Sequence, residues 1–301
     1  MKSSTKDRMI DILLIAMMIL PFVGVMVLNI LTKPPSEGIT VTGAQIYFTI
    51  DLPIQPLYIT EAQVVSLAVI VAILGLCLFL TRKLSVRPTT KRQVIAEMIV
   101  ETVDKLVAGN MGPRFMAFTP FIIAILALSG LSSLCSLLGL FPPTSDINIV
   151  GGWAILVFIL ITHYKLKGGV LPYLKGFLEP IPVMLPMNIL SEFSTPISMA
   201  FRHYGNVLSG SVIAVLIAAA LSGLSSLVLG WIPGGIGEIP LLRIGIPAVL
   251  SLYFDIFSGC MQAFIFAMLT MLNIAGGFPE ERYEARLAKK LAKQADRQAT
   301  T

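Results

Sequence analysis

The chain has 301 residues, of which 55% are hydrophobic and only 13% are charged, and its mean hydropathy is +0.85. This composition excludes an ordinary soluble domain and predicts an all-α integral membrane protein with about six hydrophobic segments. The formal net charge of +5 lies in short segments beside apolar runs, which indicates membrane orientation rather than a nucleic-acid partner.

The N-terminal region predicts one membrane span followed by a loop. Lys2, Lys6 and Arg8 precede an apolar run at residues 9–31. A secretory signal peptide has a shorter apolar region and a small-residue cleavage site, so the sequence favours an uncleaved first span over a signal peptide. Residues 32–60 are rich in proline and poor in charge, which predicts an external loop with a short hairpin.

A second span is predicted at residues 61–80, and it ends in Arg82 and Lys83. Further basic residues follow, so this side of the membrane is predicted to be the cytoplasm. At residues 94–106, apolar side chains recur at helical spacing against charged ones. This pattern predicts an amphipathic helix that does not cross the membrane and lies either on its surface or against partner subunits.

The third and fourth spans are predicted at residues 115–140 and 150–164, joined by a proline-containing turn at the external face. Asp146 and Asn148 lie in this turn. Their residue types alone leave open whether Asp146 is a turn residue or helix N-cap, or part of an ion path. After the fourth span, a segment rich in lysine, proline and aromatic residues is predicted to lie on the cytoplasmic surface.

Two apolar stretches, at residues 187–229 and 246–278, are too long for upright spans. As one helix the first would reach roughly 60 Å, twice the roughly 30 Å of bilayer hydrocarbon. Only small Gly and Ser residues interrupt it, so one long helix, tilted or bent, is preferred over two upright helices. Residues 231–240 predict an external loop, and the charged segment 279–301 predicts a cytoplasmic helix. The sequence thereby predicts six crossings with both termini in the cytoplasm.

An arginine lies in the middle of the first long stretch. Placing a guanidinium near the bilayer centre costs at least about 2.5 to 3.5 kcal/mol, so Arg202 requires an explanation. It belongs to a polar stripe whose members follow one another at intervals of three or four residues, so that they share one side of a helix. The stripe consists of Asn188, Ser191, Thr195, Ser198, Arg202, Asn206 and Ser209. An ion path is the favoured interpretation, and a structural ion pair between Arg202 and a carboxylate is the alternative.

The second long stretch also has a polar face. Asp255, Ser258 and Gln262 follow one another at helical spacing, so we expect them on one side of the last helix. Two long helices side by side would then present two polar faces to a common neighbour.

Motifs for covalent or nucleotide chemistry are missing from the sequence. Cys77, Cys135 and Cys260 lie singly in apolar runs, and the two histidines are His163 and His203. This pattern suggests neither a disulfide nor a metal site. No phosphate-binding loop and no zinc-protease motif occurs. We therefore expect no cofactor and no ATP site in this chain.

The run PISMAFRHYGN at residues 196–206 resembles the core signature of subunit a of bacterial F-type, or rotary, ATP synthases. The matching positions are Ser198, Ala200, Phe201, Arg202, Gly205 and Asn206. Two further fragments are similar to family motifs: the Pro143-x-x-Asp146-x-Asn148 pattern, and Gln262-Ala-Phe in the last helix. The resemblance covers most of residues 61–278, and the first span is an addition to it.

The resemblance implies a cation-translocating stator subunit in the bacterial plasma (inner) membrane. Its partners would be a ring of c subunits, each with a buried carboxyl group, the b-subunit stator stalk, the rest of the ATP synthase and membrane lipid. An ionised carboxyl group cannot rotate through lipid, and Arg202 would be the one place where it is tolerated. The binding carboxyl group and its ligands belong to the partner, so this chain does not distinguish proton from sodium, and the proton is taken as the default cation.

Two half-channels, separated by the arginine, would connect the ring to opposite faces of the membrane. The candidates for the external half-channel are Asn206, Asp255, Ser258, Gln262, Asp146 and Asn148. The candidates for the internal half-channel are Asn188, Ser191 and Glu192.

The sequence departs from the family pattern at three positions. His203 stands where the family usually has leucine, and Ser211 where it often has Glu or His, so Asp255 becomes the main titratable group of the external path. Glu192 falls later than the acidic residue that the family usually has on the cytoplasmic side.

Two other classes of function remain as alternatives. A stand-alone secondary cation transporter should show inverted repeats and paired broken helices, and none is apparent in the sequence. A purely structural membrane scaffold should tolerate apolar replacement of Arg202 and Gln262.

Overall fold

The computed structural model describes residues 5–32, 43–53, 55–86, 90–179, 181–229, 249–250, 252–286 and 288. These residues form helices almost throughout, with one short hairpin. Six of the described helical stretches are long and apolar enough to cross a membrane. The prediction of an all-α membrane protein is therefore confirmed.

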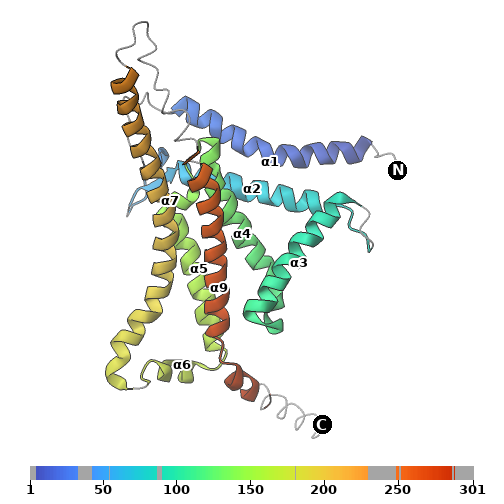
Figure 1. The fold of residues 1–301 in the computed structure, drawn as a ribbon. Helices are drawn as coiled ribbons and strands as arrows, with labels where there is room; N and C mark the ends of the chain where they lie inside the picture. Colours follow the sequence, from blue (N-terminus) through green and yellow to red (C-terminus); the bar gives the residue numbers. More distant parts are fainter. Residues whose placement is uncertain are drawn as a thin grey trace.

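The two N-terminal helices lie side by side (Figure 1). They are α1 (Thr5–Thr32) and α2 (Glu61–Thr81). The predicted hairpin is present between them as the antiparallel strands β1 (Ile46–Ile50) and β2 (Leu57–Thr60), with Ile50 opposite Leu57. Buried side chains of α1 and α2, such as Val25, Val65 and Val69, pack with Cys135 in one apolar cluster.

The amphipathic helix that was predicted at residues 94–106 is α3 (Lys91–Met111). The preceding residue Thr90 caps it, because its hydroxyl accepts a hydrogen bond from the Gln93 N–H. One side of α3 buries Val103 and Val107 in the main core. The opposite side exposes apolar residues such as Met98. A helix that is apolar on two sides suits a position between the protein and a membrane surface.

The rest of the chain forms the body of the molecule. Its elements are η1 (Pro113–Phe118), α4 (Thr119–Leu134), η2 (Cys135–Leu138), η3 (Pro143–Ser145), α5 (Ile147–Leu166), α6 (Val170–Gly176), η4 (Pro182–Met184), α7 (Leu185–Leu229), the π-helical turn η6 (Tyr253–Ser258) and α9 (Gly259–Gly276). Phe115, Phe266 and Met271 lie at the centre of a core that joins α3, α4, α5 and α9. This core fixes the helices on which α7 rests.

The long stretch from residue 187 forms one helix, as predicted. With 45 residues, α7 reaches roughly 68 Å at about 1.5 Å per residue, so it cannot stand upright in a bilayer of roughly 30 Å. Pro196 lies inside it and removes one backbone hydrogen bond, which permits a bend. Figure 1 shows α7 and α9 running nearly crosswise to α1 and α2. A single membrane cannot hold both pairs upright, and the length of α7 makes its pair the one that tilts.

The described residues include only part of the last predicted segments of the chain. The loop predicted at residues 231–240 and the beginning of the stretch at 246–278 lie outside the described residues. Of the predicted C-terminal helix, residues 280–286 are helical. Arg114 forms ion pairs with Glu280 at 3.3 Å and Glu284 at 2.7 Å, which hold this segment against the beginning of η1.

Candidate functional site

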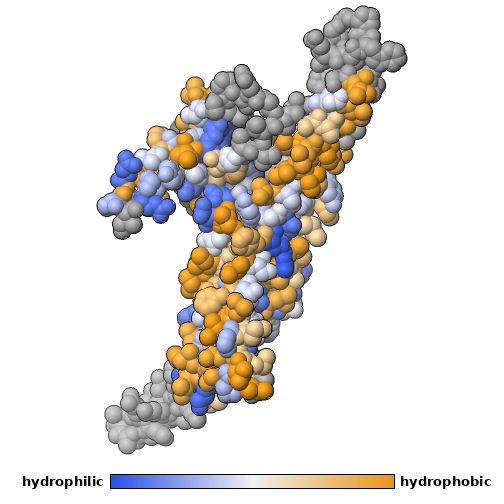
Figure 2. All heavy atoms as spheres, turned by 90° about the vertical axis from the view of Figure 1, so that its left-hand side faces the viewer, coloured by the Kyte–Doolittle hydropathy of each residue, from blue (hydrophilic) through white to orange (hydrophobic). Residues whose placement is uncertain are grey.

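The polar stripe of α7 faces outward from the described chain. Ser191, Ser198, Arg202, Asn206 and Ser209 are all exposed. No hydrogen bond or ion pair joins the Arg202 guanidinium to another described residue, so the alternative of a structural carboxylate partner is not realised in this part of the chain. Figure 2 looks onto the side of the molecule formed by α7, which is largely hydrophobic with small polar areas between. A neighbour within the membrane is the natural partner of such a surface.

The opposite side of α7 packs against the other helices through His203. Its side chain is fully buried, and Nε2 lies 3.3 Å from the Ser129 hydroxyl of α4. Trp153 of α5 and Phe266 of α9 meet the imidazole edge to face, with ring centroids 6.0 and 5.5 Å away. His203 therefore connects α7 with three helices, and its neighbour Arg202 is turned outward.

One cavity lies beside Asp146, at the end of the molecule where α5 begins. It has a volume of about 480 Å³, and its lining includes Asp146, Tyr204 and Ser211. Asp146 also caps α5, because its Oδ1 accepts a hydrogen bond from the Asn148 N–H at 2.9 Å. The two interpretations of Asp146 are thus compatible. The side chain of Asn148 is exposed and is not part of this lining.

Asp255 lies in the π-helical turn Tyr253–Ser258, which also contains Ser258. Turns of this kind occur often at functional sites. Asp255 faces a narrow cleft together with Asn206 and Ser211 of α7. Since Ser211 lines both this cleft and the Asp146 cavity, polar groups continue from one to the other.

The two predicted polar faces meet deeper in the molecule, where Asn206 of α7 donates a hydrogen bond from Nδ2 to Gln262 Oε1 at 2.7 Å. Gln262 is only 2% exposed. This contact joins α7 to α9 one helical turn after Arg202, and it ends the row of polar groups that begins at Asp146.

Two more cavities lie at the end of the helices that contains Glu192, with volumes of about 430 and 220 Å³. Asn188, Ser191 and Glu192 all line the larger one. The smaller one extends along α7 as far as Thr195. Asn188 also has a structural role, because its amide donates hydrogen bonds to backbone carbonyl groups of the segment before α7.

An ion pair lies where these two cavities meet. Lys165 Nζ of α5 is 2.8 and 2.7 Å from the two carboxylate oxygens of Glu192, and both residues line both cavities. The Tyr173 hydroxyl donates to Glu192 Oε1 at 3.3 Å. Desolvation, followed by the nearby Glu192 charge, raises the pKa of Tyr173, so it remains a donor at neutral pH.

The structure therefore brings most of the predicted site residues together in two groups. The Asp146 group consists of Asp146, Ser211, Asp255, Gln262 and Asn206, and it reaches α7 at Asn206. The Glu192 group consists of Asn188, Ser191, Glu192, Lys165 and Thr195, and it reaches α7 at Thr195. Arg202 lies between these positions and lines none of the four cavities. Carboxylate, amide and hydroxyl groups can interact with a cation, and this chemistry is common to both groups.

The sequence interpretation missed several polar residues. Ser129, Ser132 and Ser133 of α4 and Thr144 are buried, and the Ser133 hydroxyl lies 3.4 Å from Thr144 Oγ1. Their spacing of three and four residues in an apolar run was the available signal. Lys165 belongs to the lysine-rich segment after the fourth span, which was predicted only to lie on the cytoplasmic surface.

No metal or disulfide chemistry is apparent in the described part of the chain. No group of three or more His, Cys, Asp or Glu side chains there is placed to hold a metal ion. Cys77 and Cys260 are exposed, Cys135 is buried, and all three are free thiols.

A close contact between α4 and α9 holds the Asp255 cleft in shape. A Cβ atom on Gly259 would lie 2.8 Å from Ser133 Cβ, so Gly259→Ala should push the two helices apart. We expect the melting temperature of the purified protein to fall by several degrees, because a tightly packed interface accommodates an added methyl group poorly. Gly152→Ala in α5 is the control, since nothing lies within 4 Å of its added Cβ. Equal melting temperatures for the two variants would contradict the prediction.

Comparison with known proteins identifies similar chains. The family model described as ATP synthase A chain matches residues 63–275. ATP synthase subunit a of Bacillus subtilis is 32% identical over 243 residues, which cover 76% of this chain and 96% of that protein. ATP synthase subunit a 1 of Crocosphaera subtropica is 31% identical over 217 residues, or 70% and 83% of the two chains. The sodium ion specific ATP synthase subunit a of Propionigenium modestum is 36% identical over 142 residues, or 47% and 42%.

Proposed function

The chain belongs to the family of ATP synthase subunit a, and on this premise we propose that it carries cations between the two sides of the membrane and the rotating ring of c subunits. Membership of the family makes it an ion-translocating membrane subunit of an F-type ATP synthase. The proposal concerns how it works: two half-channels that do not join, with Arg202 between them.

The observation that carries this proposal is the position of the cavities relative to α7. The Asp146 group and the Glu192 group approach α7 on the two sides of Arg202 and stop at Asn206 and Thr195. A cation that follows one group cannot continue into the other without passing Arg202. A fixed positive charge opposes that passage, so the cation must move onto another carrier.

The carrier in this proposal is the carboxyl group of a c subunit, which meets the exposed stripe of α7. Arg202 projects outward without a partner among the described residues and is available to stabilise the ionised carboxylate. Neutralised by a cation, that carboxyl group leaves the arginine and rotates into lipid. Each charge that crosses contributes about 2.3 kcal/mol per 100 mV of membrane potential.

The Asp146 group is assigned to the external half-channel and the Glu192 group to the internal one. The reason is the basic residues at the end that holds Glu192, where Lys165 and Lys167 lie at the end of α5. Positive residues favour the cytoplasmic side, so we also expect both termini there. The b-subunit stalk is the expected partner outside the ring.

Thiol labelling tests the two half-channels directly. After Cys77, Cys135 and Cys260 are replaced by serine, Ser211→Cys should react with a membrane-impermeant thiol reagent only from the external side. Ser191→Cys should react only from the cytoplasmic side. Oriented vesicles, right side out and inverted, separate the two. Leu216→Cys is the control: Leu216 is 60% exposed but lines none of the four cavities, so lipid should protect it. Labelling of Ser211→Cys from the cytoplasmic side would contradict the proposal.

The proton is the proposed cation. The similarity to a sodium ion specific relative covers less than half of this chain, so it does not make sodium the preferred cation. ATP-driven acidification of inverted vesicles should therefore proceed without sodium. If acidification requires sodium ions, sodium is the transported cation, and the proposed arrangement of two half-channels is unchanged.

A further inference from the structure

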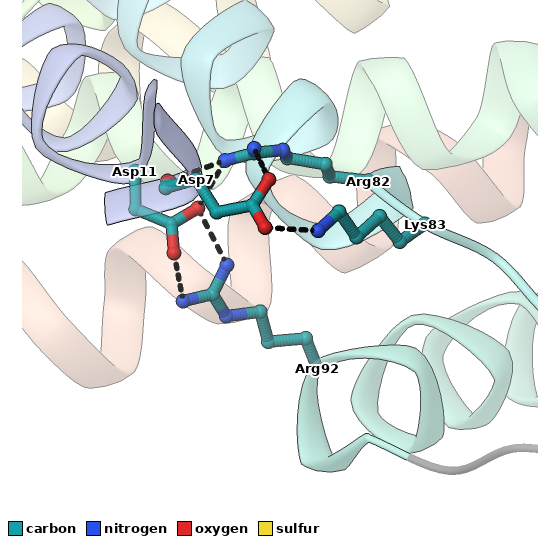
Figure 3. A network of polar contacts seen from close by, with 5 residues as sticks. All are labelled: Asp7, Asp11, Arg82, Lys83 and Arg92. Carbon is teal, nitrogen blue, oxygen red and sulfur yellow. Dashed lines mark hydrogen bonds and ion pairs between the residues drawn. The ribbon is translucent and has the colours of Figure 1, made fainter. Parts of the chain in front are cut away.

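The helix α1 precedes the residues that match the family, yet it is bound firmly at both ends. At its beginning, Asp7 and Asp11 point into a cluster of basic residues (Figure 3). Asp11 accepts from Arg82 at 2.7 Å and pairs with Arg92 at 2.9 Å, and Asp7 pairs with Arg82 at 2.8 Å and Lys83 at 2.6 Å. The cluster joins α1 to the end of α2 and the beginning of α3.

The other end of α1 makes a contact of a different kind, around a buried carboxylate. Glu61, the first residue of α2, is 5% exposed, and Asn29 of α1 is 8% exposed. Asn29 Nδ2 donates to Glu61 Oε1 at 2.7 Å. The backbone N–H of Phe141 donates to the same oxygen at 3.1 Å. A buried carboxylate needs such donors, because an unpaired one is costly in a medium of low dielectric constant.

The hairpin adds a third element to this contact. The Tyr47 hydroxyl of β1 donates to Asn29 Oδ1 at 3.4 Å. Desolvation, followed by the Glu61 charge, raises the pKa of Tyr47, so the hydroxyl keeps its proton and can donate at neutral pH. Asn29 therefore lies between a donor on β1 and an acceptor on α2, and its amide orientation is determined by both.

Phe141 connects this contact to the proposed external half-channel. It begins the turn that ends at Asp146, and Phe141, Ser145 and Asp146 all line the 480 Å³ cavity. We propose that Asn29 and Glu61 are positioning residues for the outer mouth, by which we mean the part of this cavity formed by residues 141–146. Helix α1 would then influence the cation path indirectly: Asn29 holds Glu61, and Glu61 holds the backbone N–H of Phe141. The inference rests on the proposed function, which assigns this cavity to the path.

The test is a set of variants in the complete ATP synthase, each combined with Ser145→Cys in the cysteine-free background. Asn29→Leu keeps the side-chain size but removes the amide. We expect the labelling rate at Ser145→Cys to change by about fivefold, the factor that corresponds to one lost hydrogen bond. The external proton concentration for half-maximal flux should rise by about the same factor, while the maximal flux changes little.

Two matched comparisons separate positioning from general damage. Asp11→Asn weakens the other end of α1 and leaves Glu61 untouched, so it should change neither the labelling rate nor the half-maximal concentration. Glu61→Gln retains an oxygen that accepts from Phe141, so it should remain close to the parent, whereas Glu61→Leu should behave like Asn29→Leu. If Asn29→Leu assembles poorly, the milder Asn29→Ser gives the same comparison, with complex content measured by immunoblot.

The outcomes distinguish this inference from the proposed function. Sided labelling of Ser211→Cys together with unchanged labelling and flux in Asn29→Leu would overturn the inference alone. The same holds if Asp11→Asn is as defective as Asn29→Leu, or if Glu61→Gln is as defective as Glu61→Leu. Loss of sidedness at Ser211→Cys in the parent chain would instead overturn the proposed function.

Discussion

Replacing Arg202 with alanine should abolish coupled proton pumping while the ATP synthase still assembles. The guanidinium has no partner among the described residues and is exposed on α7, so its loss should leave packing within the chain intact. In the proposed function, a charge near the bilayer centre is worth about 2.5 to 3.5 kcal/mol, which corresponds to a roughly 70- to 400-fold loss of the rate at which a c-subunit carboxyl group exchanges its proton. ATP-driven acidification of inverted vesicles measures this loss, and an immunoblot of the purified complex measures assembly.

A second consequence follows from the position of Arg202 between Thr195 and Asn206. Without the fixed charge, the barrier between the two proposed half-channels should fall, so passive proton conduction should persist or increase when pumping stops. Arg202→Lys retains the charge but not the planar guanidinium, and should keep part of the coupling. Phe201→Leu, on the same exposed surface, should pump like the parent. If Arg202→Ala still shows coupled pumping, the alternative of a purely structural membrane scaffold explains the chain better.

Local periodicity predicted the parts of the site that belong to single helices. The stripe containing Arg202 follows directly from intervals of three and four residues, because the helix has a fixed geometry. The length of α7 was likewise predictable from the uninterrupted apolar run. The stripe and the length of α7 need no knowledge of how helices cross. The pairing of Asn206 with Gln262 does need it, and it was not predicted, because both polar faces were expected to meet a common neighbour.

Contacts between distant segments could not be predicted in the same way. Lys165 and Glu192 are 27 residues apart, and their meeting depends on the rotation of α5 against α7, which packing over the whole core determines. The π-helical turn at Asp255 is another example, since such turns depend on tertiary contacts rather than on residue type. Glu61 appeared to be no more than the beginning of a span, because nothing in its neighbourhood indicates a donor at Asn29 or Phe141.

The second large effect is expected at the ion pair between the two Glu192 cavities. Glu192→Gln leaves the Lys165 ammonium group without its counter-charge in the proposed internal half-channel, where it repels protons on their way out. The two side chains are 16% and 27% exposed, so the pair lies between a surface pair and a buried one. We expect proton conduction to fall by about tenfold. Passive conduction through vesicles from which the ATP-hydrolysing part has been removed is the direct measurement.

The double variant decides whether the charge or the contact matters. Adding Lys165→Met to Glu192→Gln removes the uncompensated cation, so conduction should recover most of the loss, although the pair itself is gone. Lys165→Met alone leaves a carboxylate that attracts protons, and should be milder than Glu192→Gln. The control is Glu101→Gln, because Glu101 forms a pair of the same residue types with Lys105 at 2.7 Å on the exposed surface of α3 and should have no effect. If the double variant conducts as poorly as Glu192→Gln, the unpaired charge is not the cause, and Glu192 itself must carry the proton.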